Sequence, residues 1–310
     1  MRILVTGGSG VVGSALVPEL VKSGYTVSVF DRHRDVKVPG VTYHRGDICD
    51  PFRVQEIFSA VRPDTVIHLA GMVSRKECEE TPMMAIQTNA IGMLNVIANC
   101  ERYGSRLIYS GSSEEYGAAY ETGEPVTEDT PFGHPSSIYS LTKRTAEELV
   151  QYYCTHKNLT ATVVRFFMLY GPGEYPSEYR CAIIRFMDAA MKNEPLEVHQ
   201  DTERSWCYLE DAVDAICRIV RRVQNEPLET YNIGRHEPVL TVDLALQIRE
   251  LCGSSSPIRL SPPEATIIPI KRASFDKIRE ELGWVATTDL QTGLERTYEA
   301  LVGQKKKGEA

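Results

Sequence analysis

The chain has 310 residues, and its 42% hydrophobic and 25% charged residues are typical of a soluble globular protein with one large α/β domain or two unequal lobes. The net charge is −8 and the only basic run is Lys305–Lys307, so no nucleic-acid partner is expected, and no apolar run approaches the roughly 20 residues that span a membrane. The eight cysteines are scattered without Cys-x-x-Cys spacing, which argues against a disulfide framework or a metal site and predicts free thiols in the cytoplasm.

The first predicted elements are a buried strand and a helix joined by glycines. Ile3–Val5 is a continuous apolar run of the kind that forms a buried parallel strand. The turn after it has the spacing Gly7-x-x-Gly10-x-x-Gly13, and an apolar helix follows. Glycines at this point allow a tight turn and a close approach of backbone to a pyrophosphate at a helix N-terminus. The segment therefore predicts a dinucleotide-binding turn.

The second predicted strand, Tyr25–Phe30, ends at the acidic residue Asp31. A carboxylate about 20 residues after the glycines is placed to hydrogen-bond a ribose 2′-hydroxyl and to repel a 2′-phosphate. This favours NAD as the cofactor. Arg32 and Arg34 follow directly and keep NADP as an alternative.

Further strands and helices alternate along the chain at a regular pitch. Strands are predicted over 41–44, 65–71, 106–110 and 161–167, and helices over 51–61, 84–103 and 138–153. This alternation predicts a Rossmann-type doubly wound parallel sheet, which binds ligands at the carboxyl ends of its strands. Asp47 could reach the adenine amino group, Leu69–Gly71 could let a cofactor pass over them, and His68 is expected to be a core histidine.

A tyrosine and a lysine lie four residues apart on the helix predicted over 138–153. Residues at this spacing share one helix face, so Tyr139 and Lys143 can present a phenol and an ammonium together. The strand at 106–110 brings Ser112 and Glu114 to the same edge of the sheet. We therefore expect the reactive centre at this place.

Beyond Gly171–Gly173 the pattern changes to shorter segments, including a helix at 182–192, the segment 231–234 and a helix at 241–252. This predicts a smaller C-terminal α/β lobe at 171–302, interleaved with a first domain at 1–170 that also supplies the catalytic residues. Residues 303–310 are expected to form a flexible tail.

These segments together resemble the extended short-chain dehydrogenase/reductase family, and within it the NAD-dependent nucleotide-sugar epimerases and dehydratases. The resemblance covers nearly the whole chain. The segments that carry it are Thr6–Gly13, Asp31, Asp47–Ile48, His68–Ala70, Pro82 with Asn89, Ser112–Gly117, Tyr139-x-x-x-Lys143, Arg165–Phe167 with Tyr170–Pro172, Arg204-x-x-x-Tyr208 and Leu282–Trp284.

The resemblance implies a role for each residue of the site. Tyr139 is expected to be the general base or acid at the sugar 4-hydroxyl, Ser112 to hydrogen-bond that hydroxyl, and Lys143 to hold the nicotinamide ribose and lower the phenol pKa. The implied NAD contacts are Gly7, Gly10, Val11, Val12, Gly13, Asp31, Arg32, Asp47, Ile48, Leu69, Ala70, Gly71, Asn89, Ser110, Tyr139, Lys143 and Phe166. The implied contacts to the nucleotide-diphosphate sugar are Val73, Ser112, Ser113, Tyr139, Met168, Arg204, Lys271 and Arg272.

The chain also departs from the family pattern. Met168 stands where an asparagine is usual, and the late arginine that clamps the diphosphate has no counterpart. Arg204 is the best remaining candidate for that role, with Lys271 or Arg272 as substitutes. These departures do not change the expected fold or the expected hydride chemistry. They leave the identity of the sugar undetermined.

The resemblance favours a 4-epimerase of a UDP-hexose or UDP-uronate that works through a transient 4-keto sugar. Glu114 would also suit a nucleotide-sugar 4,6-dehydratase or a UDP-glucuronate decarboxylase, and a 4-keto-sugar reductase is a further alternative. A non-catalytic dinucleotide sensor is the least favoured interpretation. A homodimer through a four-helix bundle is expected from the helices at 84–103 and 140–155, with contacts that could equally be core: Ile91, Leu94, Val150 and Tyr153.

Overall fold

The computed structural model describes residues 1–33 and 38–308, and the chain divides into two compact units. Arg34, which kept NADP as an alternative, lies outside the described residues. The first unit comprises Met1–Glu115, Ser137–Arg165 and Val213–Tyr231, and the second comprises Tyr116–Ser136, Phe166–Ala212 and Asn232–Ala310. The sequence placed residues 213–231 in the C-terminal lobe and 116–136 in the first domain, whereas each of these segments clusters with the other unit.

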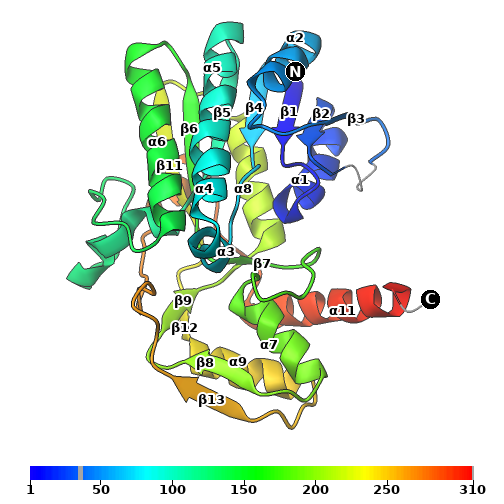
Figure 1. Cartoon of the computed structure of the whole chain (residues 1–310), viewed down its shortest axis with the longest axis vertical. Helices are drawn as coiled ribbons and strands as arrows, with labels where there is room; N and C mark the ends of the chain where they lie inside the picture. The colour runs from blue at the N-terminus through cyan, green and yellow to red at the C-terminus, as the bar shows by residue number, and fades with distance from the viewer. Residues whose placement is uncertain (34–37, 309–310) are drawn as a thin grey trace. The chain divides into compact units, whose positions relative to one another are not determined.

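The first unit is built on a seven-stranded sheet with the order β11-β6-β5-β4-β1-β2-β3 (Figure 1). Neighbouring strands from β3 to β5 pair in parallel, and Leu4 of β1 stands opposite Ser28 of β2 and Val66 of β4. This arrangement confirms the predicted Rossmann-type sheet. The strands are β1 (Arg2–Thr6), β2 (Thr26–Asp31), β3 (Thr42–Arg45), β4 (Thr65–His68), β5 (Arg106–Ser112), β6 (Ala161–Phe166) and β11 (Leu228–Ile233).

One strand of this sheet corrects the sequence analysis. The segment at 231–234 was expected in the C-terminal lobe, but β11 lies at the edge of the main sheet beside β6. Its neighbour in the sheet, β6, lies about a fifth of the chain length earlier in the sequence. The local alternation of strands and helices therefore could not reveal that β6 and β11 pair. Ala161 N–H donates to the Pro227 carbonyl at 2.8 Å where the two strands begin.

Helices cover the sheet, and α2, α5 and α6 pack side by side over a shared apolar core that includes Phe58, Val96 and Ala146. Figure 1 shows α5 and α6 in front of the sheet and α8 behind it. Ser112 at the end of β5 and Tyr139 at the start of α6 are thereby held on rigid elements. The helices are α1 (Val11–Lys22), α2 (Pro51–Val61), α3 (Arg75–Glu80), α4 (Pro82–Ile86), α5 (Met93–Tyr103), α6 (Ile138–His156) and α8 (Leu209–Arg221).

The helix predicted over 84–103 is present, but it is not a regular α-helix throughout. A π-helical segment, η1 (Gln87–Gly92), lies between α4 and α5. Gly92 permits the close approach of Ile48, because a Cβ at Gly92 would lie 2.8 Å from the Ile48 side chain. Such π-segments are frequent at functional sites, and this one carries Asn89.

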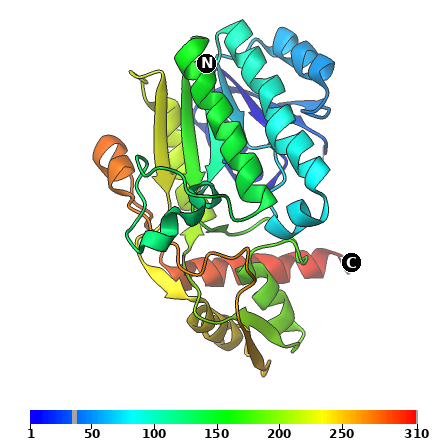
Figure 2. The same ribbon diagram turned by 60° about the vertical axis from the view of Figure 1, so that its left-hand side comes forward.

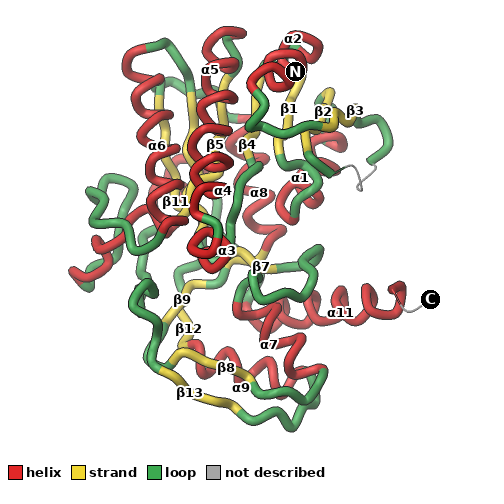
Figure 3. The backbone as a smooth tube through the Cα atoms, viewed as in Figure 1, coloured by secondary structure: helices red, strands yellow, loops and turns green. Residues whose placement is uncertain are grey.

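The second unit contains three two-stranded sheets, with the pairs β10-β7, β12-β9 and β13-β8, as the tube in Figure 3 traces. Its apolar core includes Tyr170, Trp206 and Tyr208, whose rings meet edge to face. Helix α11 runs to Gly308 and so includes much of the segment expected to be a tail; Figure 2 follows it along its length. The elements are η2 (Ser113–Thr122), β7 (Leu169–Tyr170), α7 (Ala182–Met191), β8 (Leu196–His199), β9 (Glu203–Ser205), β10 (Cys207–Tyr208), β12 (Pro238–Leu240), α9 (Thr241–Leu251), β13 (Ile258–Ser261), α10 (Asp276–Leu282) and α11 (Leu290–Gly308).

Among the helices described, none is long and apolar enough to cross a membrane.

Candidate active site

The glycine turn between β1 and α1 has the geometry of a phosphate cradle. Gly7 has φ +72°, and a Cβ there would lie 2.5 Å from the backbone nitrogen of Ala70. A Cβ at Gly10 would meet only the Gly7 carbonyl oxygen, so this side of the turn is open. Gly10 is also the N-cap of α1 and provides no side-chain cap for the first-turn N–H groups of Val11, Val12 and Gly13. An open cradle with N–H groups at a helix N-terminus fits a pyrophosphate.

Asp31 organises this turn from the end of β2. Its two carboxylate oxygens accept from Ser9 N–H at 2.9 Å and from His33 N–H at 3.0 Å. Each oxygen keeps a second lone pair, so the carboxylate can still accept from a ribose hydroxyl. Arg32 lies 4.0 Å from Asp47, whose carboxylate also accepts from Cys49 N–H. Asp31 and Arg32 at the end of β2 therefore lie near Asp47, which follows the neighbouring strand β3.

The loop after β4 is held by Asn89. The Asn89 side-chain oxygen accepts from Met72 N–H at 2.8 Å, and its amide donates to the Met72 carbonyl and to Thr142 of α6. A Cβ at Gly71 would lie 3.1 Å from the same oxygen. These bonds make Asn89 a support for the segment from Leu69 to Gly71. Val73, an implied substrate contact, is exposed on the same loop.

His68 at the end of β4 is a core histidine, as expected. Its Nδ1 lies 2.7 Å from the Thr6 hydroxyl, and its ring stacks on Tyr109. Burial and, to a smaller extent, the nearby charge of Lys143 lower the pKa of His68 to about 3. The imidazole is therefore neutral and belongs to the structural layer beneath the site.

Ser112, Tyr139 and Lys143 come together at the carboxyl end of β5, where α6 passes. Ser112 is the last residue of β5, and Tyr139 and Lys143 lie in the first two turns of α6. The Ser137 hydroxyl caps α6 by accepting from Ser140 N–H, so the helix begins directly before the tyrosine. The Ser112 side chain lies close enough to the Tyr139 phenol to lower the pKa of that phenol.

Lys143 is fixed from below by strand β5. Its ammonium donates to the Ser110 carbonyl at 2.5 Å and lies 4.6 Å from the centroid of the Tyr109 ring. Burial lowers the pKa of Lys143 to about 8, and the carboxyl groups of Glu115 and Glu147 partly oppose this effect. Ser110, an implied cofactor contact, therefore uses its carbonyl to hold the lysine.

The phenol pKa differs from the expectation. The sequence analysis expected Lys143 to lower it, but burial raises the pKa of Tyr139 well above its usual range. The Ser112 side chain acts in the opposite direction, while an ionised carboxyl group at Glu114 or Glu115 would add to the rise. The physical reason is that a phenolate here would be desolvated and would face carboxyl groups. The pKa of Tyr139 in this structure is therefore set by burial.

Glu114 lies half-buried two residues after Ser112. Its backbone N–H donates to the Ser112 hydroxyl at 3.2 Å, and its carbonyl accepts from the Ser140 hydroxyl at 2.7 Å. The backbone of Glu114 thus ties η2 to the first turn of α6. Its carboxylate is close enough to raise the pKa of Tyr139. Ser113, an implied substrate contact, is buried beside it.

Sequence reasoning missed a buried carboxyl pair below the site. The Glu115 side chain accepts from Ser112 N–H at 2.7 Å, and Arg165 donates twice to Glu147, at 2.5 and 3.1 Å. Two spacings could have revealed these residues. Ser112-x-x-Glu115 is that of a capping box, and Glu147 lies one helical turn after Lys143.

The remaining implied substrate residues lie in the second unit. Arg204 donates to the carbonyls of Glu203, Ile268 and Pro269 at 2.6 to 2.8 Å, and Arg272 pairs with Glu203 at 3.0 Å. Lys271 is buried, and Phe166 and Met168 are half-buried. Met168 has φ +39°, a left-handed conformation that a non-glycine residue rarely adopts. The Arg204 guanidinium therefore holds the loop at 268–269 in this structure.

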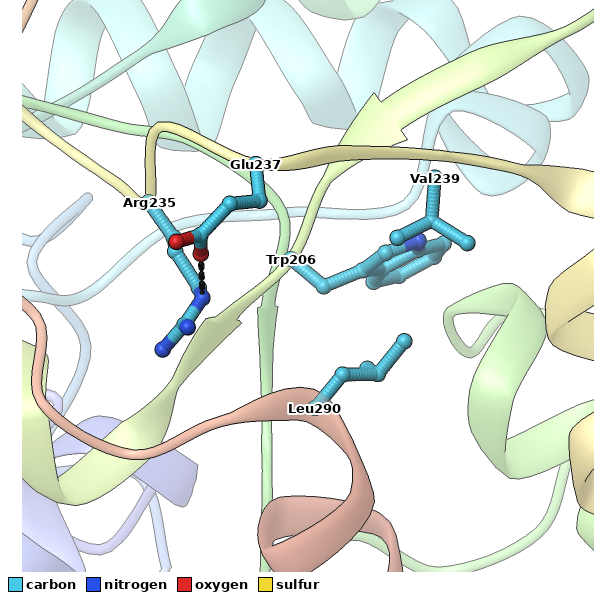
Figure 4. Close-up of a pocket in the computed structure, with 5 residues that line it drawn as sticks. All are labelled: Trp206, Arg235, Glu237, Val239 and Leu290. Atoms are coloured by element: carbon cyan, nitrogen blue, oxygen red, sulfur yellow. Dashed lines mark ion pairs between the residues drawn. The ribbon is translucent and has the colours of Figure 1, made fainter.

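A pocket of about 220 Å³ in the second unit is lined by none of the predicted site residues. Figure 4 shows its lining and the ion pair between Arg235 and Glu237. The indole nitrogen of Trp206 is buried and has no hydrogen-bond partner among the described residues. The other lining residues are Val239 and Leu290.

Comparisons with known proteins agree with this geometry. The model of the NAD dependent epimerase/dehydratase family matches residues 3–234. UDP-glucuronic acid decarboxylase 6 of Arabidopsis thaliana is 29% identical over 327 residues, covering 99% of this chain and 91% of that protein. The UDP-glucose 4-epimerase of Thermotoga maritima, solved with UDP-glucose, has a TM-score of 0.89 at 27% identity, covering 98% of this chain and 100% of that chain. MoeE5, solved with UDP-glucuronic acid and NAD, has a TM-score of 0.89 at 25% identity, with coverage of 98% and 100%.

A Rossmann-type sheet with a glycine cradle and a Ser–Tyr–Lys constellation at its carboxyl edge defines an NAD-dependent enzyme. The chain belongs to the NAD dependent epimerase/dehydratase family. The relatives named above are extended short-chain dehydrogenase/reductases that act on nucleotide sugars. The predicted family, fold class and cofactor are therefore confirmed.

Proposed function

We propose that this chain is a 4-epimerase of a UDP-linked hexose or hexuronate. The observation that carries the proposal is that the side chains of Ser112, Tyr139 and Lys143 lie buried together at the carboxyl end of β5, with Ser112 close enough to Tyr139 to act on its pKa. This arrangement presents a phenol and a hydroxyl together, the pair needed to hold a sugar hydroxyl and move its proton. The epimerase from Thermotoga maritima and the UDP-glucuronic acid complex of MoeE5 support the choice of a UDP sugar.

In the proposed reaction Tyr139 takes the proton of the C4 hydroxyl while C4 loses a hydride. Bound NAD supplies the hydride acceptor and, when oxidised, a positive charge on its nicotinamide ring. Ser112 holds the C4 oxygen, and the ammonium of Lys143 stabilises the phenolate form of Tyr139. Tyr139 would then give the proton back to the C4 oxygen that Ser112 holds as the hydride returns to the other face of C4, so that the centre would be inverted with no net oxidation.

Glu114 and the decarboxylase relative favour a second candidate, decarboxylation of UDP-glucuronate. Oxidation at C4 makes the C6 carboxylate a β-keto acid. The C5–C6 bond can then break, carbon dioxide leaves, and its electron pair moves toward the C4 carbonyl before C5 is protonated. A carboxyl group beside Tyr139 could position the sugar for this step. The same group could instead remove the C5 proton in a 4,6-dehydratase.

Product analysis separates these candidates. Purified protein is incubated with UDP-, GDP-, dTDP- and CDP-sugars without added cofactor, and products are followed by NMR. A C4 epimer supports the leading proposal, released carbon dioxide identifies a decarboxylase, and a 4-keto-6-deoxy sugar identifies a dehydratase. Turnover only when reduced nicotinamide is consumed identifies a reductase, and no turnover with any sugar overturns an enzymatic role on these substrates.

The variant Glu114→Gln sharpens the assignment. A dehydratase that uses this carboxylate as a C5 base should lose activity by about 100- to 10,000-fold, whereas an epimerase should lose only a few-fold. Glu124→Gln, in the exposed part of the loop that follows η2, is the matched control.

We also propose that the enzyme works in the cytoplasm as a homodimer. The location is supported by the cysteines, all eight of which are described and are free thiols. For the diphosphate, Lys271 and Arg272 remain proposed contacts together with Arg204, whose guanidinium also donates to three backbone carbonyls.

A further inference from the structure

Four ionisable side chains lie buried together below Ser112 in the first unit. Glu115 and Glu147 are 0% exposed, Arg165 is 3% exposed and Lys143 is 5% exposed. They come from β5 and the residues after it, from α6 and from β6. Burying ionised groups is costly unless each charge is compensated. The protonation of the two carboxyl groups is therefore decided by their hydrogen bonds.

The hydrogen bonds indicate different protonation states for the carboxyl groups of Glu115 and Glu147. Glu147 accepts from Arg165 through both oxygens, at 2.5 Å from Nη2 and 3.1 Å from Nε, as an ionised carboxylate does. Glu115 Oε1 accepts from Ser112 N–H at 2.7 Å. Glu115 Oε2 is buried and accepts no hydrogen bond within the described chain, and Arg165 Nε is 4.0 Å away. A proton on Oε2 would donate to Glu147, which lies within hydrogen-bond reach, and would satisfy this oxygen.

The charges of the surrounding groups agree with this assignment. Burial and the adjacent Glu147 carboxylate raise the pKa of Glu115 well above its usual range, against the opposing effects of Lys143 and Arg165. The other titratable groups that face Glu115 are the phenols of Tyr109 on β5 and Tyr139 on α6, both of whose pKa values are raised. With Glu115 neutral, two cations face one anion.

We propose that Glu115 is a positioning residue that stays protonated in the working enzyme, where it donates to Glu147, holds the backbone of Ser112 and leaves the charge of Lys143 available to Tyr139. The kinetic part of this inference rests on the proposed function. An ionised Glu115 would cancel the remaining positive charge and raise the pKa of Tyr139 further, which opposes proton removal from the sugar. The carboxyl group thus acts through Ser112 and Tyr139 without touching the substrate.

Infrared spectroscopy tests whether Glu115 is protonated, and it needs no substrate. The protein as purified, with the NAD it carries, should show the carbonyl band of a protonated carboxylic acid at neutral pH. The band should disappear in Glu115→Gln and persist in Glu148→Gln, an exposed residue of α6. A wild-type spectrum without the band, or its persistence in Glu115→Gln, overturns the proposal.

Kinetics test the positioning. In Glu115→Gln the amide oxygen can accept from Ser112 and the amide nitrogen can donate to Glu147, so we expect kcat within about threefold of wild type. The acidic limb of its pH profile should coincide with that of wild type. A shift of this limb to lower pH would mean that wild-type Glu115 carries a negative charge, and would overturn the proposal.

The variant Glu115→Val removes both bonds. We expect kcat to fall by about 10- to 100-fold with KM little changed, because Ser112 is misplaced while the outer contacts of the substrate remain. Wild-type activity in this variant, or an equal loss in Glu115→Gln, contradicts the positioning role. Thermal unfolding checks both variants, and Glu115→Gln alone carries the test if the valine variant does not fold. If wild type turns over no nucleotide sugar, the proposed function fails while the infrared result still decides the proton.

Discussion

Burial is the first cause of every large pKa shift among the residues around Tyr139. It raises the pKa of Tyr139, lowers that of Lys143 to about 8 and lowers that of His68 to about 3. Each shift disfavours the charged form. A charge on any of these residues therefore costs free energy in the folded protein, and charge or hydrogen bonding supplied by a bound ligand would offset that cost.

Replacing the phenol of Tyr139 tests the proposed role of this residue in proton transfer. Tyr139→Phe should lower kcat by about 100- to 10,000-fold and leave KM close to wild type, because the proton-transfer group is lost while the contacts to the nucleotide remain. Tyr152→Phe, an exposed position on the same helix, is the control. The measurement is product formation by NMR over a range of substrate concentrations. Equal activity in Tyr139→Phe and wild type would refute the mechanism.

The buried lysine should carry a stability cost. The pKa of Lys143 falls from 10.5 to about 8, so folding opposes its charge by about 3 kcal/mol at neutral pH. Lys143→Met removes this cost and also loses the hydrogen bond from the ammonium to Ser110, worth about 1.5–3 kcal/mol for a charged donor. We therefore expect the inactive variant to be more stable than wild type by up to about 1.5 kcal/mol at pH 7.

The stability gained in Lys143→Met should depend on pH, and the pKa of Lys143 gives the direction of this dependence. Below pH 8 the lysine is protonated in both the folded and the unfolded state, so the cost is fully present; between pH 8 and 10.5 the folded state releases its proton first and the cost disappears. The gain in Lys143→Met should accordingly shrink as the pH rises through this window. Denaturant unfolding at pH 7 and pH 9.5 measures it, and a gain that grows with pH would contradict the assigned pKa.

Elements with a strong local signal were predicted well, and those defined by distant partners were not. The turn from Gly7 to Gly13, strand β4 and helix α6 follow from glycine spacing, a continuous apolar run and helical periodicity. The π-segment η1 could not be predicted, because it depends on the packing of Gly92 against Ile48 and on the bonds of Asn89. Glu115 was likewise read only as part of a motif, since its burial depends on β6 and α6.

Gly13 and Gly303 both lie in helices, but only at Gly13 would an added Cβ meet closely packed atoms. In Gly13→Ala the new Cβ of α1 would lie 2.5 Å from the Gly8 Cα, so the cradle must deform. We expect lower stability and weaker retention of NAD. In Gly303→Ala of α11 the Cβ would meet nothing within 4 Å, and the substitution should stabilise the protein by about 0.5–1 kcal/mol. Thermal unfolding and the NAD content of the purified protein measure both effects, and stabilisation of Gly13→Ala would contradict the packing argument.

At the scale of the whole molecule, the chain passes repeatedly from one unit to the other, and this limited the sequence analysis. Residues 213–231 return to the first unit after the second has begun, and β11 completes the main sheet there. A single boundary near residue 170 could not describe such a chain. The roles expected for Arg204 and Met168 came only from motif resemblance, and neither the carbonyl contacts of Arg204 nor the positive φ of Met168 has a signal in the sequence.

The proposed homodimer is best tested at an apolar surface of the first unit. Met83, Met84, Ile86, Ile91, Leu141 and Tyr152 are exposed on α4, η1 and α6, which contact one another. Of the contacts expected from sequence, Ile91 is 43% exposed, whereas Val150 is buried in the core and is therefore excluded. Exposed apolar residues that gather on neighbouring helices mark interfaces, and a two-fold pairing through α4, η1 and α6 would cover them.

The double variant Ile91→Glu/Leu141→Glu should convert the protein to monomers, because two carboxylates on each copy would be buried and would repel their counterparts across the two-fold axis. Light scattering after size exclusion measures the mass, which for one chain is 34.7 kDa. Phe52→Glu is the matched control, since Phe52 is 83% exposed on α2 and lies outside this surface. A wild-type monomer, or a double variant that stays dimeric, would show that these helices do not form the interface.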